Sequence, residues 1–123
     1  MTSTTTRPVP STTTPAASRW RPVCAARSLP KGGAIGLHVA GHPVAVFRTC
    51  DGELFALADV DPEADAPLST GQLASRRDVP VVVGPSGRRF ELARGVCVAG
   101  GAAVASFPVR VTDGAVEVAL PAA

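Results

Sequence analysis

The sequence predicts an all-β domain, an antiparallel sandwich or small barrel of about eight short strands. Short apolar or alternating segments recur along the chain and are bounded by Gly, Pro and Asp-Gly turns. Two Asp-Gly pairs each separate two apolar segments, which is the pattern of a β-hairpin. No window supports a long amphipathic helix.

The first 18 residues differ from the rest of the chain. Ten of them are Ser or Thr and three are Pro, so they cannot bury enough apolar surface to offset the entropy of ordering. A targeting peptide would need a basic start and an apolar stretch, and only Arg7 is basic here. We expect residues 1–18 to be a disordered, dispensable tail and residues 19–123 to form one domain.

The first half of the domain is expected to hold four strands, at Trp20–Cys24, Ile35–Val39, Pro43–Arg48 and Leu54–Leu57. Lys31-Gly32-Gly33 turns the chain after the first of them, and Gly41 joins the second to the third. Asp51-Gly52 predicts a type I′ turn between the third and the fourth.

Residues 59–78 contain Pro62, Pro67 and Gly71 and predict an extended loop, with one or two helical turns within Leu68–Ser75. Asp113-Gly114 predicts the last hairpin. The strands expected in this half are Val79–Val83, Arg89–Leu92, Phe107–Val111 and Val116–Leu120. Loops 59–70 and 83–88 would lie at strand tips, where functional sites are commonly built.

Composition excludes several classes of function. Twelve basic and ten acidic residues give a net charge of +2, too balanced for a nucleic-acid or membrane surface. No apolar run approaches the ~18 residues of a membrane span. The three cysteines and the absence of a secretory signal predict a reduced, cytoplasmic protein. Cys24 and Cys97 are expected to be buried and Cys50 more exposed.

The residues that could bind metals do not form a convincing site. His38 and His42 flank a glycine turn without a cysteine pair, so two ordinary strand residues are expected instead of a zinc site. The acidic run is Asp59, Asp61, Glu63 and Asp65. It resembles the start of a calcium loop, but Ala64 and Thr70 stand where that loop needs Gly and Glu.

Hydrolytic and phosphate-binding motifs are also missing. There is no G-x-S-x-G, no phosphate loop and no dinucleotide fingerprint. We therefore expect no catalytic residues in this chain.

Residues 20–121 carry an ordered set of motifs: Trp20-x-x-Val23-Cys24, Leu29-Pro30-x-Gly32, Asp51-Gly52-x-Leu54-Phe55, Leu68-Ser69-x-Gly71, Phe90-x-Leu92-x-x-Gly95-x-Cys97 and Phe107-Pro108-Val109-Arg110-Val111-x-Asp113-Gly114. This set resembles the small subunit of assimilatory NAD(P)H-dependent nitrite reductase, a branch of the Rieske-like fold. The resemblance covers essentially all of the chain except the tail.

A true Rieske ferredoxin binds its two irons through C-x-H before Pro-Leu-Ser-x-Gly and C-x-x-H before a Gly-x-x-Phe segment. In this sequence the first pair of positions falls at Asp61 and Glu63, and the second at Val83 and Ser86. The resemblance therefore implies a domain with vacated ligand positions and no cluster, cofactor or metal of its own. Many small subunits of this family share that absence.

The resemblance also implies a large partner subunit that carries FAD, siroheme and an iron–sulfur cluster and reduces nitrite to ammonia in nitrate assimilation. This chain would support that subunit by contact. Two alternatives stay open: a free-standing Rieske-like binding module that serves another oxidoreductase, and, less favoured, a [2Fe–2S] ferredoxin.

The loops around the vacated positions carry opposite charges. The first holds the acidic run and the second holds Arg88 and Arg89, so ion pairs between them could partly replace the cross-link that a cluster provides. Alternatively, both loops are solvated or contact the large subunit. The residues expected to face a partner are Asp61, Pro62, Glu63, Leu68, Ser69, Pro85, Ser86 and Arg88.

Overall fold

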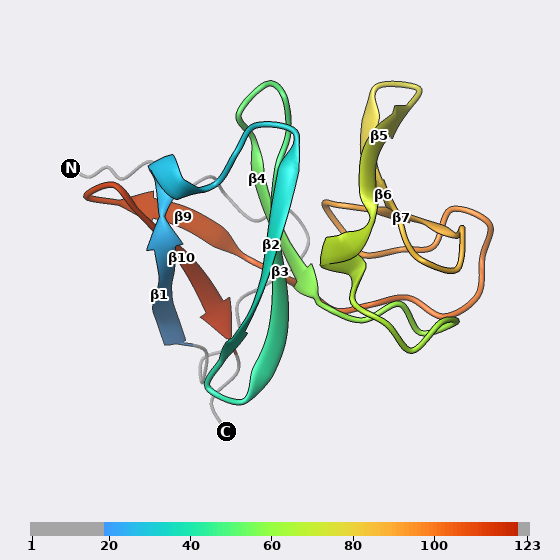
Figure 1. Cartoon of the computed structure of the whole chain (residues 1–123), viewed down its shortest axis with the longest axis horizontal. Helices are drawn as coiled ribbons and strands as arrows, with labels where there is room; N and C mark the ends of the chain where they lie inside the picture. The colour runs from blue at the N-terminus through green and yellow to red at the C-terminus, as the bar shows by residue number, and fades with distance from the viewer. Residues whose placement is uncertain (1–18, 121–123) are drawn as a thin grey trace.

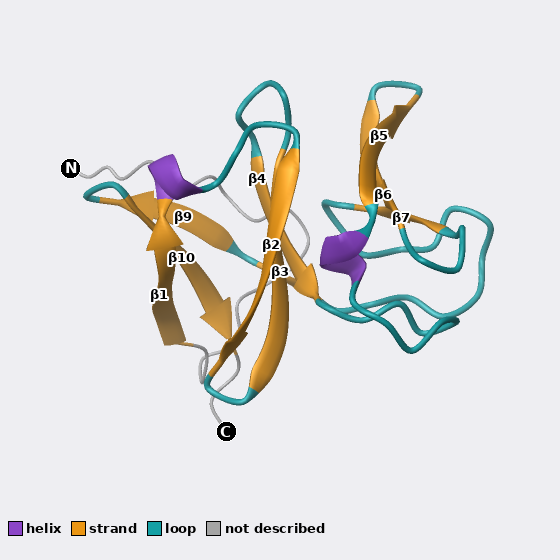
Figure 2. Ribbon diagram, in the orientation of Figure 1, coloured by secondary structure: helices purple, strands orange, loops and turns teal. Residues whose placement is uncertain are grey.

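Three antiparallel sheets lie side by side as layers in the computed structural model, which describes residues 19–120 (Figure 1). Apart from two short 3₁₀ turns, η1 (Ala26–Ser28) and η2 (Leu68–Thr70), the regular structure of these residues is entirely β (Figure 2). The all-β prediction is thus confirmed. The predicted disordered tail, residues 1–18, lies outside the described residues.

The first layer has the strand order β1 (Arg19–Ala25), β10 (Ala115–Leu120) and β9 (Val109–Thr112). The middle layer has the order β2 (Gly33–Val39), β3 (His42–Arg48), β4 (Leu54–Ala58) and β8 (Ser106–Phe107). The third has the order β5 (Gln72–Arg76), β6 (Val79–Val83) and β7 (Arg89–Glu91). All neighbouring strands are antiparallel.

The third layer is an insertion between two strands that pair with each other. Ala56 and Leu57 of β4 face Phe107 and Ser106 of β8, yet residues 59–105 leave the middle sheet, build the small sheet and return. The two crossing segments run together below the small sheet in Figure 1. The vacated ligand positions all lie on this insertion.

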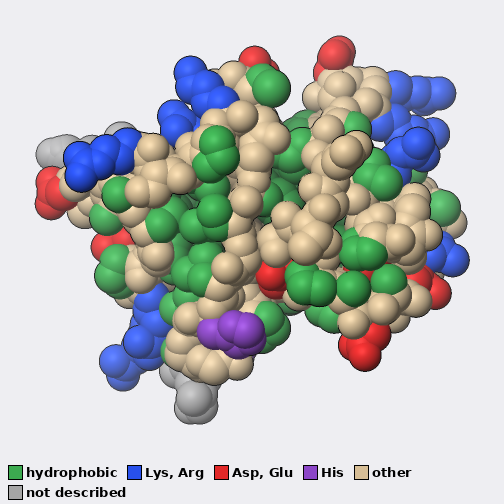
Figure 3. Space-filling view, in the orientation of Figure 1, with side chains coloured by type: hydrophobic (Ala, Val, Ile, Leu, Met, Phe, Trp, Pro, Cys, Tyr) green, Lys and Arg blue, Asp and Glu red, His purple; other side chains and the backbone are tan. Residues whose placement is uncertain are grey.

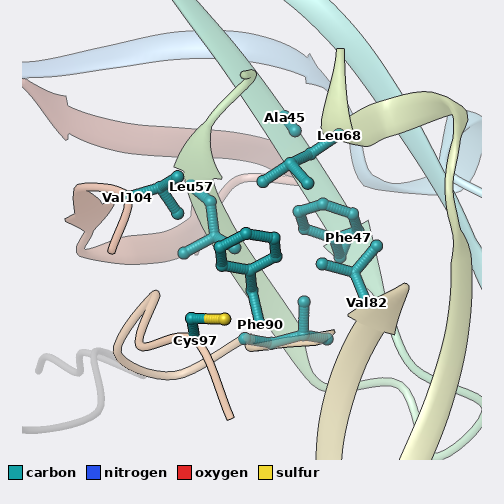
Figure 4. Packing of buried hydrophobic residues seen from close by; sticks show 9 residues of the cluster. Ala45, Phe47, Leu57, Leu68, Val82, Phe90, Cys97 and Val104 are labelled. Atoms are coloured by element: carbon teal, nitrogen blue, oxygen red, sulfur yellow. The ribbon is translucent and has the colours of Figure 1, made fainter. Parts of the chain in front are cut away.

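Strand β3 is buried on both faces because the middle sheet separates two cores. Val44 and Val46 point into a core shared with the first layer. Ala45 and Phe47 point into a second core shared with the small sheet, where Phe47 packs near Phe90 (Figure 4). Burial of a large apolar side chain stabilises a fold by about 1.5–3 kcal/mol relative to exposure. The second core therefore holds the insertion in place.

The described residues contain ten strands, two more than the eight expected. The sequence predicted a loop over residues 59–78 and helical turns within 68–75; this was wrong from Gln72 onward. η2 is a single 3₁₀ turn, after which β5 pairs with β6. The strand expected over Phe107–Val111 is interrupted at Pro108, where the chain passes from the middle sheet to the first.

The type I′ turn predicted at Asp51-Gly52 is also wrong. Only Gly52 has a positive φ (91°), and residues 49–53 form a longer loop in which the Gly52 N–H donates to the Thr49 carbonyl. Asp113-Gly114 does form the predicted last hairpin, with φ values of 52° and 80°. Positive φ at both central residues is the requirement of a type I′ turn.

The burial of the cysteines agrees with the prediction for two of the three. Cys97 is buried and Cys50 is exposed, as expected, whereas Cys24 is only half-buried. His38 and His42 lie at the closed end of the β2–β3 hairpin, seen at the lower edge of Figure 3. No helix among residues 19–120 is long and apolar enough to cross a bilayer.

Candidate functional site

The four vacated ligand positions meet where two loops of the insertion approach each other. Asp61 and Glu63 lie in the first loop, which follows β4, and Val83 ends β6. Ser86 lies in the tight second loop, where Gly84 and Gly87 N–H groups donate to the carbonyls of Arg88 and Gly84. Asp61 is fully buried, Val83 is half-buried, and Glu63 and Ser86 are exposed.

The Asp61 carboxylate joins the two loops. Its Oδ1 accepts a hydrogen bond from the Glu63 backbone N–H at 2.9 Å, and its Oδ2 accepts one from the Ser86 backbone N–H, also at 2.9 Å. Gly84 makes room for it, because a Cβ at that position would collide with Asp61 Oδ2 and press on Leu68. One buried side chain thus connects three of the vacated positions.

The Asp61 carboxylate is held in its ionised form. Burial alone raises its pKa, but hydrogen bonds outweigh that effect and lower the pKa below the ordinary aspartate value. The donors are the Ser86 side chain and the backbone N–H groups of Ser86, Glu63 and Ala64. Several N–H groups aimed at one carboxylate favour its charged form in this way.

Arg88 links the two loops to a third segment, residues 97–104. Its Nε lies 3.9 Å from Glu63 Oε1, and its Nη1 donates to the Gly100 carbonyl at 3.3 Å and approaches Cys97 Sγ at 3.9 Å. The Cys97 contact and the Glu63 charge both raise the pKa of Arg88. An ion pair between the predicted loops therefore exists, but it is long and exposed.

Asp59, the first residue of the acidic run, has a different role from the one expected. Asp59 is not part of a solvated face: its Oδ1 accepts the Ser69 N–H at 2.7 Å and its Oδ2 accepts the Ser69 hydroxyl at 2.9 Å. Gly36 of β2 lies against both side chains. Asp59 therefore fastens η2 to the middle sheet. Among the described residues, Asp61 and Arg89 make no ion pair.

Of the eight residues expected to face a partner, half are exposed: Pro62, Glu63, Pro85 and Ser86. Ser69 and Arg88 are half-buried, and the side chains of Asp61 and Leu68 are buried. Leu68 belongs to the core between the middle and small sheets, beside Phe90 and Leu57 (Figure 4). Its loop reaches the surface, but its side chain does not.

A Rieske cluster does not fit these residues. The cluster needs two thiolates and two imidazoles, whereas these positions supply two carboxylates, a hydroxyl and the aliphatic Val83. The Asp61 oxygens already accept hydrogen bonds, and the thiol of Cys97 lies in the second core. Within residues 19–120 there is also no group of three or more metal-binding side chains.

The structure brings the predicted ligand positions together, and it adds two contacts that the sequence did not predict. The bond from Ser86 N–H to Asp61 depends on how a loop folds 25 residues away, and no local pattern encodes it. The Asp59–Ser69 pair has no local signal either, since the two residues are ten apart in the sequence.

Comparisons with known proteins identify the fold as Rieske-like. The family model of the Rieske-like [2Fe-2S] domain matches residues 19–119. No match was found among curated proteins.

Several solved structures share the fold. A Mycobacterium tuberculosis protein assigned as an NADH-dependent nitrite reductase small subunit is 32% identical over 86% of this chain and 98% of that chain, with a TM-score of 0.81. The E. coli protein NirD is 26% identical over 84% and 97%, with a TM-score of 0.76. A chain from the complex of reduced oxygenase and oxidized ferredoxin in carbazole 1,9a-dioxygenase is 30% identical over 81% and 92%, with a TM-score of 0.70.

Proposed function

Because this chain belongs to the Rieske-like [2Fe-2S] domain family, we propose that it is the small, non-redox subunit of a cytoplasmic NAD(P)H-dependent nitrite reductase. It supports by protein contact a large subunit that carries FAD, siroheme and an iron–sulfur cluster and converts nitrite to ammonia in nitrate assimilation. This chain supplies no group to the chemical steps.

One observation carries the proposal: the fold and loops of a cluster-binding domain are kept while its ligand positions hold Asp61, Glu63, Val83 and Ser86. A domain selected only for electron transfer has no reason to keep these loops without ligands. The Asp61–Ser86 hydrogen bond preserves their approach. Likeness to a nitrite reductase small subunit at 32% identity points to the same reductase class.

The proposed contact surface lies on the three loops around Asp61. Its exposed residues are mostly small and apolar: Pro62, Ala64, Pro85, Ala99, Ala102 and Ala103. Hydrophobic and acidic side chains gather on this lower right part of the molecule in Figure 3. Small apolar residues on well-ordered loops lose little side-chain entropy when a partner covers them.

Two measurements test this function. The chain is co-expressed with a large siroheme-containing nitrite reductase subunit, and we expect the two to co-purify and the chain to contain no iron. NADH- or NADPH-dependent nitrite reduction is then measured with and without the chain. If deletion of the chain leaves both the amount and the activity of the large subunit unchanged, the proposal is wrong.

A second candidate is a binding module that serves another oxidoreductase. It is favoured by the 30% identity to a chain from an oxygenase–ferredoxin complex. In that case the chain would co-purify with a partner that lacks siroheme, and nitrite reduction would be unaffected by its loss.

A further inference from the structure

A cleft of about 550 Å³ opens between the middle sheet and the small sheet, at the end of the insertion opposite to Asp61. One wall is the β3–β4 loop, and the other is the β5–β6 hairpin; Figure 1 shows both at the top of the molecule. The volume lies within the usual range of ligand-binding clefts, ~300–1,000 Å³. Nothing in the proposed function uses this cleft.

The cleft has an apolar floor and an acidic rim. Leu73, Pro80 and Leu92 line it from the small sheet, and no Lys or Arg is among the described residues that line it. Asp51 and Glu53 stand on one wall and Asp78 on the other. Asp51 and Asp78 are exposed, and neither makes an ion pair with the described residues. Figure 3 shows acidic side chains on both sides of the hollow.

An open strand edge also borders the cleft. Strand β5 is the outermost strand of its sheet and pairs only with β6 among the described strands. Three successive residues of β5, Leu73 to Ser75, line the cleft. Leu73 and Ser75 share one face of the β5–β6 pair with Pro80, the partner of Ser75. The cleft therefore lies over this face, and the open edge of β5 borders it.

This edge lacks the usual protection against strand pairing. Natural edge strands carry Pro, inward charges or bulges that block another strand. β5 has no Pro, no register shift with β6, and no charge before its last residue, Arg76. Its unpaired N–H and C=O groups can therefore add an extended segment by β-augmentation.

We propose that the cleft binds an extended, basic segment of a partner protein. The segment pairs with β5 as an added strand, places a small apolar side chain over Leu73, and sets a Lys or Arg between Asp51 and Asp78. The charge of the rim selects the basic side chain, and the open edge selects the extended backbone. This site is separate from the loop surface proposed for the large subunit and does not depend on that proposal.

The first test titrates the full chain with a blocked peptide of alternating Arg and Val, matched to the five residues of β5, and with its Glu-for-Arg counterpart. We expect the Arg peptide to bind and the Glu peptide to bind more weakly. The D51N/D78N variant should weaken the Arg peptide by roughly 2- to 30-fold, the effect of two exposed charge pairs. Higher salt should also weaken binding of the Arg peptide, because it screens the same charges.

The matched control is Asp113→Asn, an exposed aspartate at the β9–β10 turn, away from the cleft. Asp78 and Asp113 both have positive φ, 67° and 52°, a conformation that Asn tolerates. The D113N variant should therefore fold and bind like the native chain. Equal binding of the two peptides, or no effect of D51N/D78N, would overturn the proposal.

Cys50 gives an independent readout because it lines the cleft and is exposed, whereas Cys24 is half-buried and Cys97 is buried. The bound Arg peptide should slow maleimide labelling of Cys50 at least twofold. If Cys50 is protected in the full chain and released by deleting residues 1–18, the occupant is the chain's own N-terminal segment. If protection rises with protein concentration, the occupant is a second copy. Either result overturns the proposal.

Discussion

Asp61 stands at a position where a Rieske domain has a metal-binding thiolate, and here it performs a different linking task. A cluster joins the two loops through four ligands; Asp61 joins them through hydrogen bonds to the backbone of Glu63 and Ser86. Both acceptor oxygens belong to one side chain, so the link depends on Asp61. A change at Ser86 removes its side-chain donor but keeps its backbone N–H.

Replacing Asp61 by Asn should destabilise the fold. Asn keeps one acceptor oxygen, but its amide group then meets the Ser86 or Glu63 N–H and leaves a buried donor without an acceptor. We expect a loss of about 1–3 kcal/mol in the free energy of unfolding, measured by urea denaturation. Asp65→Asn is the control, since Asp65 is exposed on the same loop with φ of 52°. Equal stability of the two variants would contradict this role.

The contribution of Asp61 should also depend on pH. Its folded-state pKa lies below the unfolded value of about 3.9, so the stabilisation is fully present above that value and is lost as pH falls through the folded-state pKa. The stability difference between the native chain and Asp61→Asn should be constant from about pH 5 to 7 and should shrink below about pH 4. A difference that persists unchanged at pH 3 would rule out the ionised carboxylate as its source.

The ion pair predicted between the loops is located at Glu63 and Arg88, not at Asp61. Both side chains are substantially exposed, 43% and 40%, and their charged atoms are 3.9 Å apart. A double-mutant cycle with Glu63→Gln and Arg88→Gln should give a coupling energy below about 1 kcal/mol that falls further at high salt. A coupling of several kcal/mol would mean that this pair, and not Asp61, holds the loops together.

Among the elements, the turn residues explain which hairpins the sequence predicts and which it does not. Asp113-Gly114 was recognised because it contains the favoured residues of a type I′ turn. The β5–β6 hairpin has the same two-residue geometry, but Arg77 and Asp78 adopt φ values of 52° and 67° without a glycine. The sequence around Arg77 therefore lacks the Asn-Gly or Asp-Gly signal of a two-residue hairpin, and it predicts a loop where β5 forms.

The β2–β3 turn tests how much a left-handed backbone without glycine costs in stability. Ala40 has φ of 50° at the first central position of that turn, a left-handed conformation that costs a residue with a Cβ roughly 1 kcal/mol. Ala40→Gly should raise the free energy of unfolding by about 0.5–1 kcal/mol in a denaturant titration. Ala34→Gly within β2 is the control and should lower it by a similar amount, since Gly weakens a strand interior.

For the whole molecule, the sequence predicts an antiparallel sandwich or small barrel, and the structure has three sheets in layers. Val44 to Phe47 form a continuous apolar run, which is the pattern of a strand buried on both faces. The alternation in other strands fitted a two-layer fold equally well. The insertion of the small sheet between two paired strands, β4 and β8, involves contacts distant in sequence, which local patterns do not encode.

The same arrangement predicts that the lost cluster can be restored. The second core, with Phe47, Phe90 and Leu68, holds the small sheet independently of any ligand, so a bound cluster can replace Asp61 as the link between the loops. We expect a variant with Asp61→Cys, Glu63→His, Val83→Cys and Ser86→His to bind two irons per chain and to show the visible absorption of a Rieske centre.

The control for this restoration carries the other three substitutions and keeps Val83. It lacks one thiolate, so it should remain colourless while folding to a similar extent by circular dichroism. A folded four-substitution variant without iron would show that the loops have drifted from cluster geometry and that Asp61 sets their present spacing. Iron bound with a Rieske spectrum would show instead that the loops retain that geometry, and that the native chain lacks only the ligands.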